Sequence, residues 1–226
     1  MIIVGICGGS GSGKSTFAER IRDGLSCSCE IMRLDCYYFD QGGKPFEERT
    51  KVNYDSPEIF DFDEMLADIR LLIDGKPVTR KGYNYAEHRR DDSEELMYPP
   101  EVLIIEGIHV FYDDRICDVM NLKLFIKVDS DICLLRRIAR DMNERGRSLE
   151  SISEQYKATV KPMREKYIDR YIDKADVVVM RGGMNEQALK TTISYLKSCV
   201  KEQRLVESEK KRKRRKRFRI NRNNCG

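Results

Sequence analysis

The stretch GGSGSGKST at residues 8–16 carries the clearest chemical signal in the chain. Its spacing, G-x-x-x-x-G-K-S, is that of a phosphate-binding P-loop, in which glycines let the backbone approach a pyrophosphate. In such a loop backbone N–H groups meet the β and γ phosphates, the lysine reaches the terminal phosphates, and the serine hydroxyl ligates Mg²⁺. The expected nucleotide-binding residues are Gly8, Gly9, Ser10, Gly11, Ser12, Gly13, Lys14, Ser15 and Thr16.

Two carboxylates follow apolar runs that are predicted to be strands. Asp35 comes directly after IMRL, and Glu106 comes directly after VLII. Ligands of open α/β sheets bind beyond the carboxyl ends of the strands, so we expect both acids to lie near the P-loop. There they suit phosphoryl transfer, because Mg²⁺ takes oxygen ligands and an acceptor hydroxyl needs a carboxylate to take its proton. The predicted metal ligands are Ser15, Asp35 and Glu106.

Short apolar runs alternate with helical patterns along the chain and predict the elements that position these groups. The runs are continuously apolar, which is typical of parallel strands covered on both faces. We therefore expect an α/β fold, a three-layer P-loop NTPase-type arrangement with a five-stranded parallel sheet. The predicted strands are residues 2–6, 31–34, 102–105, 122–128 and 177–180, and the predicted helices are residues 14–23, 57–74, 130–144, 149–164 and 185–204.

The pattern changes between residues 76 and 100. The segments VTRKGYNY and ELMYPP flank the polar stretch AEHRRDDSE, which favours a β-hairpin outside the main sheet. Because the ligand of such a sheet lies beyond the strand ends, an insertion there is expected to shape a substrate pocket. We predict that this hairpin is a flap.

The charge of the chain is unevenly distributed. The net charge is +4, and the ten basic residues from Lys210 onward exceed it, so residues 1–209 carry a net charge of −6. We expect a kinase domain over residues 1–205 and a basic, disordered tail over residues 206–226. The tail could contact RNA or another polyanion, or it could be a solvated segment without a dedicated partner.

No signal-peptide pattern and no membrane-spanning run of roughly 18 apolar residues is found in the sequence. The eight cysteines lie among strand and helix patterns, and Cys27 and Cys29 have no nearby histidine that would complete a metal site. We therefore expect a cytoplasmic protein without a membrane span, with reduced thiols.

Several blocks of the chain resemble the uridine-cytidine kinases, which belong to the phosphoribulokinase/uridine kinase group of P-loop kinases. The resemblance runs from Ile2 to about Gly183 and includes GGSGSGKST, DCYYFD, PFEERTKVNYDSPEIFDFD, YNYAEHRR, VLIIEGIHVFYDDRICD and the long segment RRIARDMNERGRSLESISEQYKATVKPMREKYIDRYIDKADVVV. It implies ATP-dependent phosphorylation of the 5′-hydroxyl of uridine or cytidine, with Mg²⁺, to give UMP or CMP in pyrimidine salvage. It also implies a homo-oligomer, since relatives are often tetrameric.

The resemblance places the nucleoside acceptor among residues from several blocks. It implies that Asp35 is the general base facing the 5′-hydroxyl. Asp55 resembles the acid that accepts hydrogen bonds from the ribose diol, which would disfavour 2′-deoxynucleosides because a lost donor leaves a buried acceptor unpaired. For His88 the alternative is a flap histidine facing water, and His109 is expected to be structural. The pocket residues implied in this way are Tyr38, Asp55, Tyr83, Tyr85 and His88.

Five arginines lie in RRIARDMNERGR, where Gly146 interrupts the helical pattern. This segment, about residues 136–156, resembles the lid of these kinases, whose closure brings guanidinium groups onto the moving phosphoryl charge. A solvated cationic helix face is the alternative. The residues implied to contact the nucleoside are Arg137, Arg147 and Gln155, and those implied in catalysis are Lys14, Asp35, Arg140 and Arg145.

The chain departs from the resemblance at three positions and leaves some properties open. Ser56, Asn84 and Arg89 stand where the related kinases usually have other residues, which leaves the preference between uridine and cytidine undetermined. The donor could be ATP or GTP. Alternative functions are a phosphoribulokinase-like kinase, which the aromatic stretch YNYAEH disfavours, and a nucleotide-regulated RNA-binding protein that acts through its basic tail.

Overall fold

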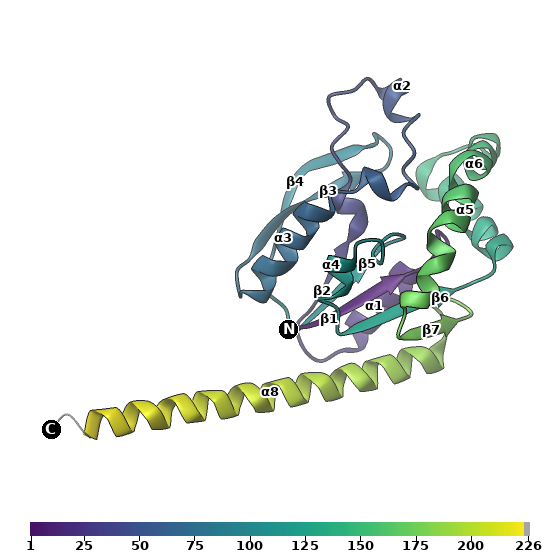
Figure 1. Ribbon diagram of the computed structural model, residues 1–226. Helices are drawn as coiled ribbons and strands as arrows, with labels where there is room; N and C mark the ends of the chain where they lie inside the picture. Colours follow the sequence, from purple (N-terminus) through teal and green to yellow (C-terminus); the bar gives the residue numbers. More distant parts are fainter. Residues whose placement is uncertain (224–226) are drawn as a thin grey trace.

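A five-stranded parallel sheet forms the centre of the molecule (Figure 1). The computed structural model describes the backbone of residues 1–223 and the side chains of residues 1–210 and 212. Neighbouring strands pair in parallel, which confirms the predicted α/β fold class. In sheet order the strands are β2 (Cys29–Arg33), β5 (Val102–Glu106), β1 (Ile2–Cys7), β6 (Leu122–Lys127) and β7 (Val177–Met180).

Helices cover both faces of this sheet and extend from its carboxyl edge. The 3₁₀ turns Leu34–Tyr37, Pro57–Ile59 and Ile168–Lys174 lie in the segments between the other elements. The helices are α1 (Lys14–Gly24), α2 (Phe46–Arg49), α3 (Phe62–Ile73), α4 (Asp114–Cys117), α5 (Ser130–Arg145), α6 (Leu149–Gln155), α7 (Lys161–Lys166) and α8 (Glu186–Asn223).

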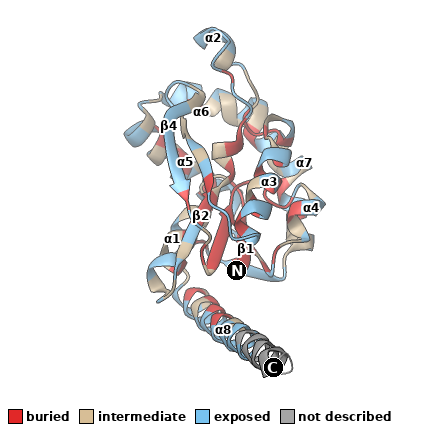
Figure 2. Ribbon diagram, turned by 90° about the vertical axis from the view of Figure 1, so that its left-hand side faces the viewer, coloured by how far each residue is buried: buried red, intermediate tan, exposed pale blue. Residues whose placement is uncertain are grey.

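The central strand β1 contributes to two separate apolar cores, because alternate residues of a strand point to opposite faces. Ile6 belongs to the core that includes Phe17 of α1 and Leu196 of α8. Ile3 belongs to the opposite core, which includes Met65 of α3. Figure 2 shows the buried strands between these helices. The continuously apolar strand pattern thus produces a three-layer domain.

Two predicted helices begin or continue differently in the structure. In the segment 57–74, a 3₁₀ turn comes first and α3 begins after Asp61, whose side chain accepts the N–H of Glu64 as an N-cap. The segment 149–164 contains a π-helical turn, Tyr156–Val160, between α6 and α7. Pro162 has no N–H to continue the α-helical pattern, and the N–H of Lys161 reaches back five residues to Tyr156.

The segment after α3 forms a two-stranded antiparallel hairpin, β3 (Val78–Asn84) and β4 (Arg89–Met97), outside the main sheet. Its register shifts between Lys81 and Tyr83, at a bulge. Such a bulge bends the ribbon and re-aims the side chains beyond it. The tip of the hairpin therefore carries Tyr83 and Tyr85 to the carboxyl edge of the sheet.

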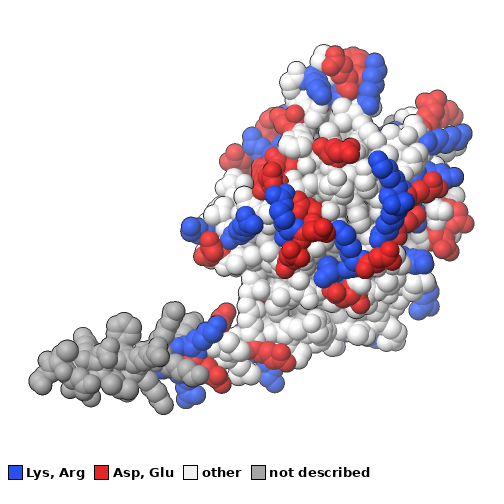
Figure 3. Space-filling model, viewed as in Figure 1, with Lys and Arg blue, Asp and Glu red and all other residues white. Residues whose placement is uncertain are grey.

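Helix α8 continues through residues 206–223, where the sequence predicted a disordered tail. Lys, Arg and Glu are good helix formers, and a helix that is already nucleated extends more easily than a new one begins. Figure 1 shows the helix leaving the body of the domain, and Figure 3 shows acidic and basic side chains interspersed over the body. Within the described residues, no helix is both long and apolar enough to cross a bilayer.

Candidate active site

The P-loop joins β1 to α1, and its glycines adopt backbone conformations that other residues avoid. Gly11 and Gly13 have φ angles of 82° and 89°. A Cβ atom at Gly11 would lie 2.3 Å from the carbonyl oxygen of Cys133, so the loop also approaches α5 too closely for a side chain. Gly13 is the N-cap residue of α1, which leaves the first N–H groups of that helix at the loop. The loop can therefore bind an anion through its backbone N–H groups.

A serine hydroxyl and a buried carboxylate meet beside the loop. The hydroxyl of Ser15 donates to Oε1 of Glu106 at 3.0 Å, and Nε of Arg33 lies 3.6 Å from the same oxygen. Burial raises the pKa of Glu106, while Lys14 opposes the shift. Oε2 of Glu106 is buried without a hydrogen-bond partner among the described residues. A buried carboxylate oxygen that lacks a donor suits a cation, so these residues fit the predicted Mg²⁺ site.

The cation would need further ligands, because the described part of the chain contains no group of three His, Cys, Asp or Glu side chains that could hold a metal. Mg²⁺ commonly uses one or two carboxylates and completes its shell with water and substrate phosphates. The pair Ser15 and Glu106 is therefore typical of a site that is finished by a bound nucleotide. Asp35, Ser15 and Glu106 all line one cleft.

Asp35 lies in the 3₁₀ turn after β2, where the flap reaches it. The hydroxyl of Tyr85 donates to Oδ2 of Asp35 at 2.5 Å. Burial, and then the neighbouring Asp35 carboxylate, raise the pKa of Tyr85, so its hydroxyl keeps its proton. The guanidinium of Arg145 lies 4.2 Å from the centre of the Tyr85 ring. Through Tyr85 the flap therefore contacts both Asp35 and Arg145.

A second acid, Asp55, is buried. Its Oδ2 accepts a hydrogen bond from the Thr159 hydroxyl at 3.0 Å, and its Oδ1 lies 3.9 Å from Arg137. Burial raises the pKa of Asp55, and Arg137 acts against this shift. The backbone carbonyl of Asp55 is 2.7 Å from Nε2 of His109, whose Nδ1 is 2.9 Å from the Tyr171 hydroxyl. His109 therefore holds the backbone that positions this acid.

Aromatic side chains form a wall between the two acids. The rings of Tyr38 and Tyr83 are 4.6 Å apart, and the Tyr54 ring stacks on His88 at 5.0 Å. Burial and then Arg147 lower the pKa of His88, so its imidazole is neutral at pH 7. A neutral imidazole offers one donor and one acceptor. This wall can therefore bind a flat heterocycle and contact its polar edge.

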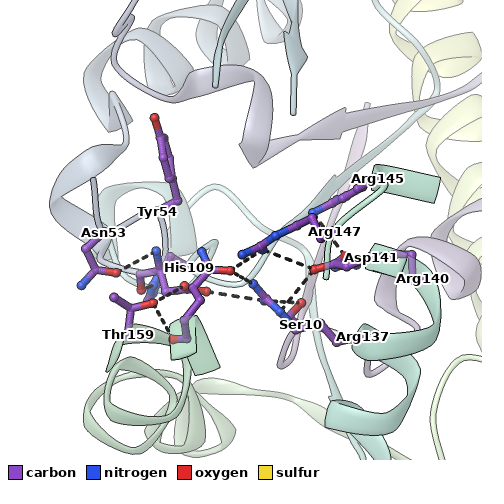
Figure 4. A network of polar contacts seen from close by, with 12 residues as sticks. Ser10, Asn53, Tyr54, His109, Arg137, Arg140, Asp141, Arg145, Arg147 and Thr159 are labelled. Atoms are coloured by element: carbon purple, nitrogen blue, oxygen red, sulfur yellow. Dashed lines mark hydrogen bonds and ion pairs between the residues drawn. The ribbon is translucent and has the colours of Figure 1, made fainter. Parts of the chain in front are cut away.

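The arginines of α5 and the following turn surround one buried acid, Asp141 (Figure 4). Asp141 has no exposed side-chain surface. Two of the arginines, Arg137 and Arg147, also donate to Oε1 of Gln155. Arg137 donates in addition to the hydroxyl of Ser10 in the P-loop, at 3.1 Å. The arginines of α5 and the following turn are therefore packed over the P-loop and do not form a solvated helix face.

One cleft of about 800 Å³ brings most of the predicted residues together. This volume is in the range of sites that enclose a small molecule. The remaining P-loop residues and Thr16 do not line it, and the glycines contribute backbone only. The predicted residues that line the cleft are Ser10, Lys14, Ser15, Asp35, Tyr38, Asp55, Tyr83, Tyr85, His88, Glu106, Arg137, Arg140, Arg145, Arg147 and Gln155.

Sequence reasoning did not identify three residues that organise this cleft. Thr159 reaches Asp55 from the π-helical turn, and Tyr54 stacks on His88. Asp141 is the buried centre of the arginine cluster. Only Asp141 left a signal in the sequence, because it follows Arg137 by four residues and would lie on the same helix face.

The comparisons with known proteins show the family of the chain. A family model described as the phosphoribulokinase / uridine kinase family matches residues 3–188. A curated uridine kinase from Ligilactobacillus salivarius is 41% identical over 201 residues, which cover 88% of this chain and 94% of that protein. A uridine kinase from Streptococcus uberis is 44% identical over 189 residues, which cover 83% of this chain and 90% of that protein.

Solved structures share the fold at low sequence identity. A possible uridine kinase from Bacillus stearothermophilus aligns with a TM-score of 0.55 at 16% identity, covering 78% of this chain and 87% of that one. The phosphoribulokinase from Rhodobacter spheroides aligns with a TM-score of 0.58 at 13% identity, and the alignment covers 79% of this chain and 69% of that one. These similarities concern the fold.

Proposed function

The chain belongs to the phosphoribulokinase / uridine kinase family, and from this premise we propose that it phosphorylates the 5′-hydroxyl of uridine at the expense of ATP. The observation that carries the proposal is the arrangement of one cleft. Lys14, Ser15 and Glu106 line this cleft together with Asp35, Asp55 and the aromatic wall. The first three would form a donor end for the phosphate donor, and Asp35, Asp55 and the wall would form an acceptor end for the nucleoside.

The donor end would bind the triphosphate through the backbone of the P-loop and through Lys14. We propose that Ser15 and Glu106 hold Mg²⁺, with Asp35 nearby, because the free oxygen of Glu106 is buried there. When bound, the ion neutralises phosphate charge that develops as the reaction proceeds. GTP would fit the same phosphate contacts, since those contacts do not involve the purine.

At the acceptor end Asp35 would take the proton of the 5′-hydroxyl. The oxygen then forms a bond to the γ-phosphorus, the bond between that phosphorus and the oxygen that bridges it to the β-phosphorus breaks, and ADP leaves. Tyr85 already donates to Oδ2 of this carboxylate, so the substrate hydroxyl would bind the remaining acceptor positions of Asp35 or take the place of Tyr85. Arg140 and Arg145 line the cleft on the lid side and would stabilise the transferring group.

Asp55, with Thr159 beside it, would accept the ribose hydroxyls. Tyr38, Tyr83 and the neutral His88 would surround the pyrimidine, and Arg137, Arg147 and Gln155 would close over the nucleoside. Because neutral imidazole presents a donor on one nitrogen and an acceptor on the other, we propose that cytidine is a second substrate. The phosphoribulokinase-like alternative is disfavoured by the aromatic rings of the cleft, which suit a flat base and have no role in binding a sugar phosphate.

The remaining expectations are part of the same proposal. We propose a catalytic domain over residues 1–205, with a flap at 76–100 and a lid at 136–156, and an accessory basic segment at 206–226 that can contact RNA or another polyanion. Seven cysteines of the described residues are free thiols, which agrees with a cytoplasmic location. A homo-oligomer is also proposed, on the resemblance to related kinases.

The experiment is to measure UMP formation from ATP and uridine for the unmodified protein and two variants. Asp35→Asn removes the base, so kcat should fall by about 100-fold or more while ATP affinity stays near normal. Asp118→Asn removes an exposed carboxylate outside the cleft and serves as the matched control. A protein that forms no UMP, or an Asp35→Asn variant with normal kcat, would refute the proposal.

A further inference from the structure

The acid at the centre of the arginine cluster has a distinctive set of partners. Oδ1 of Asp141 lies 2.7 Å from Arg140 and 3.6 Å from Arg145. Oδ2 lies 3.5 Å from Arg137 and 3.8 Å from Arg147. The carboxylate thus divides the arginines into two pairs, one on each oxygen (Figure 4).

The cluster is not neutral. Asp141, which has no exposed surface, and Asp55, which lies 3.9 Å from Arg137, are two carboxylates that face four guanidinium groups. Of the four, only Arg140 makes hydrogen bonds to the Asp141 carboxylate, while Oδ2 of Asp141 and Nε of Arg137 are buried without a hydrogen-bond partner among the described residues. Arginines this close repel one another, so the cluster retains positive charge that favours an additional anion.

The two pairs also differ in their other contacts. Arg137 and Arg147 share Gln155 as an acceptor, and Arg137 is 7% exposed. Arg140, Arg145 and Arg147 are similarly accessible, with 32%, 27% and 26% of their side chains exposed, and all four arginines line the cleft. The pair on Oδ2 thus shares a second hydrogen-bond acceptor, whereas in the pair on Oδ1 Arg145 contacts the Tyr85 ring and, among the described residues, neither arginine donates a hydrogen bond to a side chain other than Asp141.

We propose that Asp141 is a positioning residue that holds the lid arginines together before the reaction, and that the transferring phosphoryl group takes over its Oδ1 pair. Arg140 and Arg145 then bind the phosphoryl group, while Arg137 and Arg147 remain on Oδ2 and Gln155. The proposal rests on the proposed kinase function. It assigns to Asp141 an action through the arginines, with no contact to substrate.

Two opposite effects follow when the charge of Asp141 is removed. The cluster becomes more positive, so phosphate anions bind in the ground state as tightly as before or more tightly. The arginines lose the group that orients them, so the transition state is stabilised less well. A fall in kcat without a rise in KM for ATP is therefore expected, whereas a merely structural acid would lose kcat, affinity and thermal stability together.

The test compares Asp141→Asn with Glu144→Gln, which removes an exposed carboxylate from the same helix. For each protein the kcat and KM with ATP and uridine are measured, together with the Kd for ADP and the melting temperature. We expect Asp141→Asn to lower kcat by about 10-fold or more, since one arginine acting on the phosphoryl group is worth about 10³-fold or more in related reactions. Its Kd for ADP should be unchanged or lower, and Glu144→Gln should match the unmodified protein.

A kcat within about twofold of the unmodified protein, or a Kd for ADP that rises together with the loss of kcat, would overturn the proposal. If Asp141→Asn does not fold, Asp141→Glu replaces it, because it keeps the charge and moves the carboxylate by one methylene. That variant should keep the Kd for ADP and lose kcat, and a normal kcat would overturn the proposal equally. A protein that binds ADP but never converts uridine would refute the proposed function alone, since the ADP measurements still test the lid.

Discussion

The proposed ribose contact of Asp55 can be tested by removing one hydroxyl from the substrate. The Asp55 side chain is buried, and its Oδ2 accepts one hydrogen bond from the protein, donated by Thr159. An ionised carboxylate has about four acceptor positions, so it has room for a ribose diol. We expect the 2′-hydroxyl of uridine to donate to Asp55, and 2′-deoxyuridine to lack this bond.

The magnitude follows from the charge of the acceptor. A hydrogen bond to a charged group contributes about 1.5–3 kcal/mol, which corresponds to about 10- to 150-fold in kcat/KM. In Asp55→Asn the acceptor is a neutral amide oxygen, whose hydrogen bond contributes about 0.5–1.5 kcal/mol. The preference for uridine over 2′-deoxyuridine should therefore shrink to about 2- to 12-fold in the variant.

The assay measures kcat/KM for both nucleosides with the unmodified protein, with Asp55→Asn and with Asp74→Asn. Asp74 is an exposed acid at the end of α3, so its substitution controls for the loss of a negative charge. The ratio of the two kcat/KM values is the readout, because a general loss of activity cancels in it. Equal values for the two nucleosides in the unmodified protein, or an undiminished ratio in Asp55→Asn, would refute the ribose assignment.

Three other expectations concern the flap, the buried histidine and the basic segment. Tyr85→Phe frees Asp35, so ATP hydrolysis without nucleoside should rise severalfold while uridine turnover changes little; unchanged hydrolysis would contradict the blocking role. Burial lowers the pKa of His109 to about 4. As the pH falls below 6.5, the unfolded chain therefore binds a proton at this histidine that the folded chain does not bind. The free energy of unfolding should fall by about 3 kcal/mol by pH 4. Urea denaturation at both pH values should show a smaller loss in His109→Gln, and an equal loss would exclude His109 as the source. Deleting residues 210–226 should leave uridine turnover within about twofold of normal, since the cleft lies in residues 10–159, and a larger loss would make the segment part of the catalytic domain.

The central sheet and the donor end of the cleft could be predicted because their signals are local. Each strand is covered on both faces, so its residues form a continuous apolar run. The P-loop is recognisable because its turn needs glycine at positions such as Gly11 and Gly13, where φ is positive. Strand-end acids could then be placed beside the loop by the topology alone.

The acceptor end depends on contacts between distant segments, which a local pattern does not reveal. Tyr85 and Asp35 are 50 residues apart, and Thr159 and Asp55 are 104 residues apart. Thr159 reaches Asp55 from a π-helical turn that ordinary helical spacing does not predict. For Asp141, the same spacing that places it near Arg137 is also common on solvated helix faces, so its burial could not be read from the sequence.

The three departures from the resembled kinases do not line the cleft, which changes what they imply for base preference. Ser56 donates to Glu58, and the side chain of Asn84 accepts the N–H groups of Ala86 and Glu87 in the hairpin turn. Arg89 pairs with acids of its own hairpin, one of which is Asp92. Asn84 and Arg89 therefore act on the shape of the flap, whereas Ser56 lies outside the flap, next to Asp55 in the chain. Selection between a carbonyl and an amine on the pyrimidine is therefore expected to depend on the cleft-lining residues, above all on which ring nitrogen of the neutral His88 carries the proton.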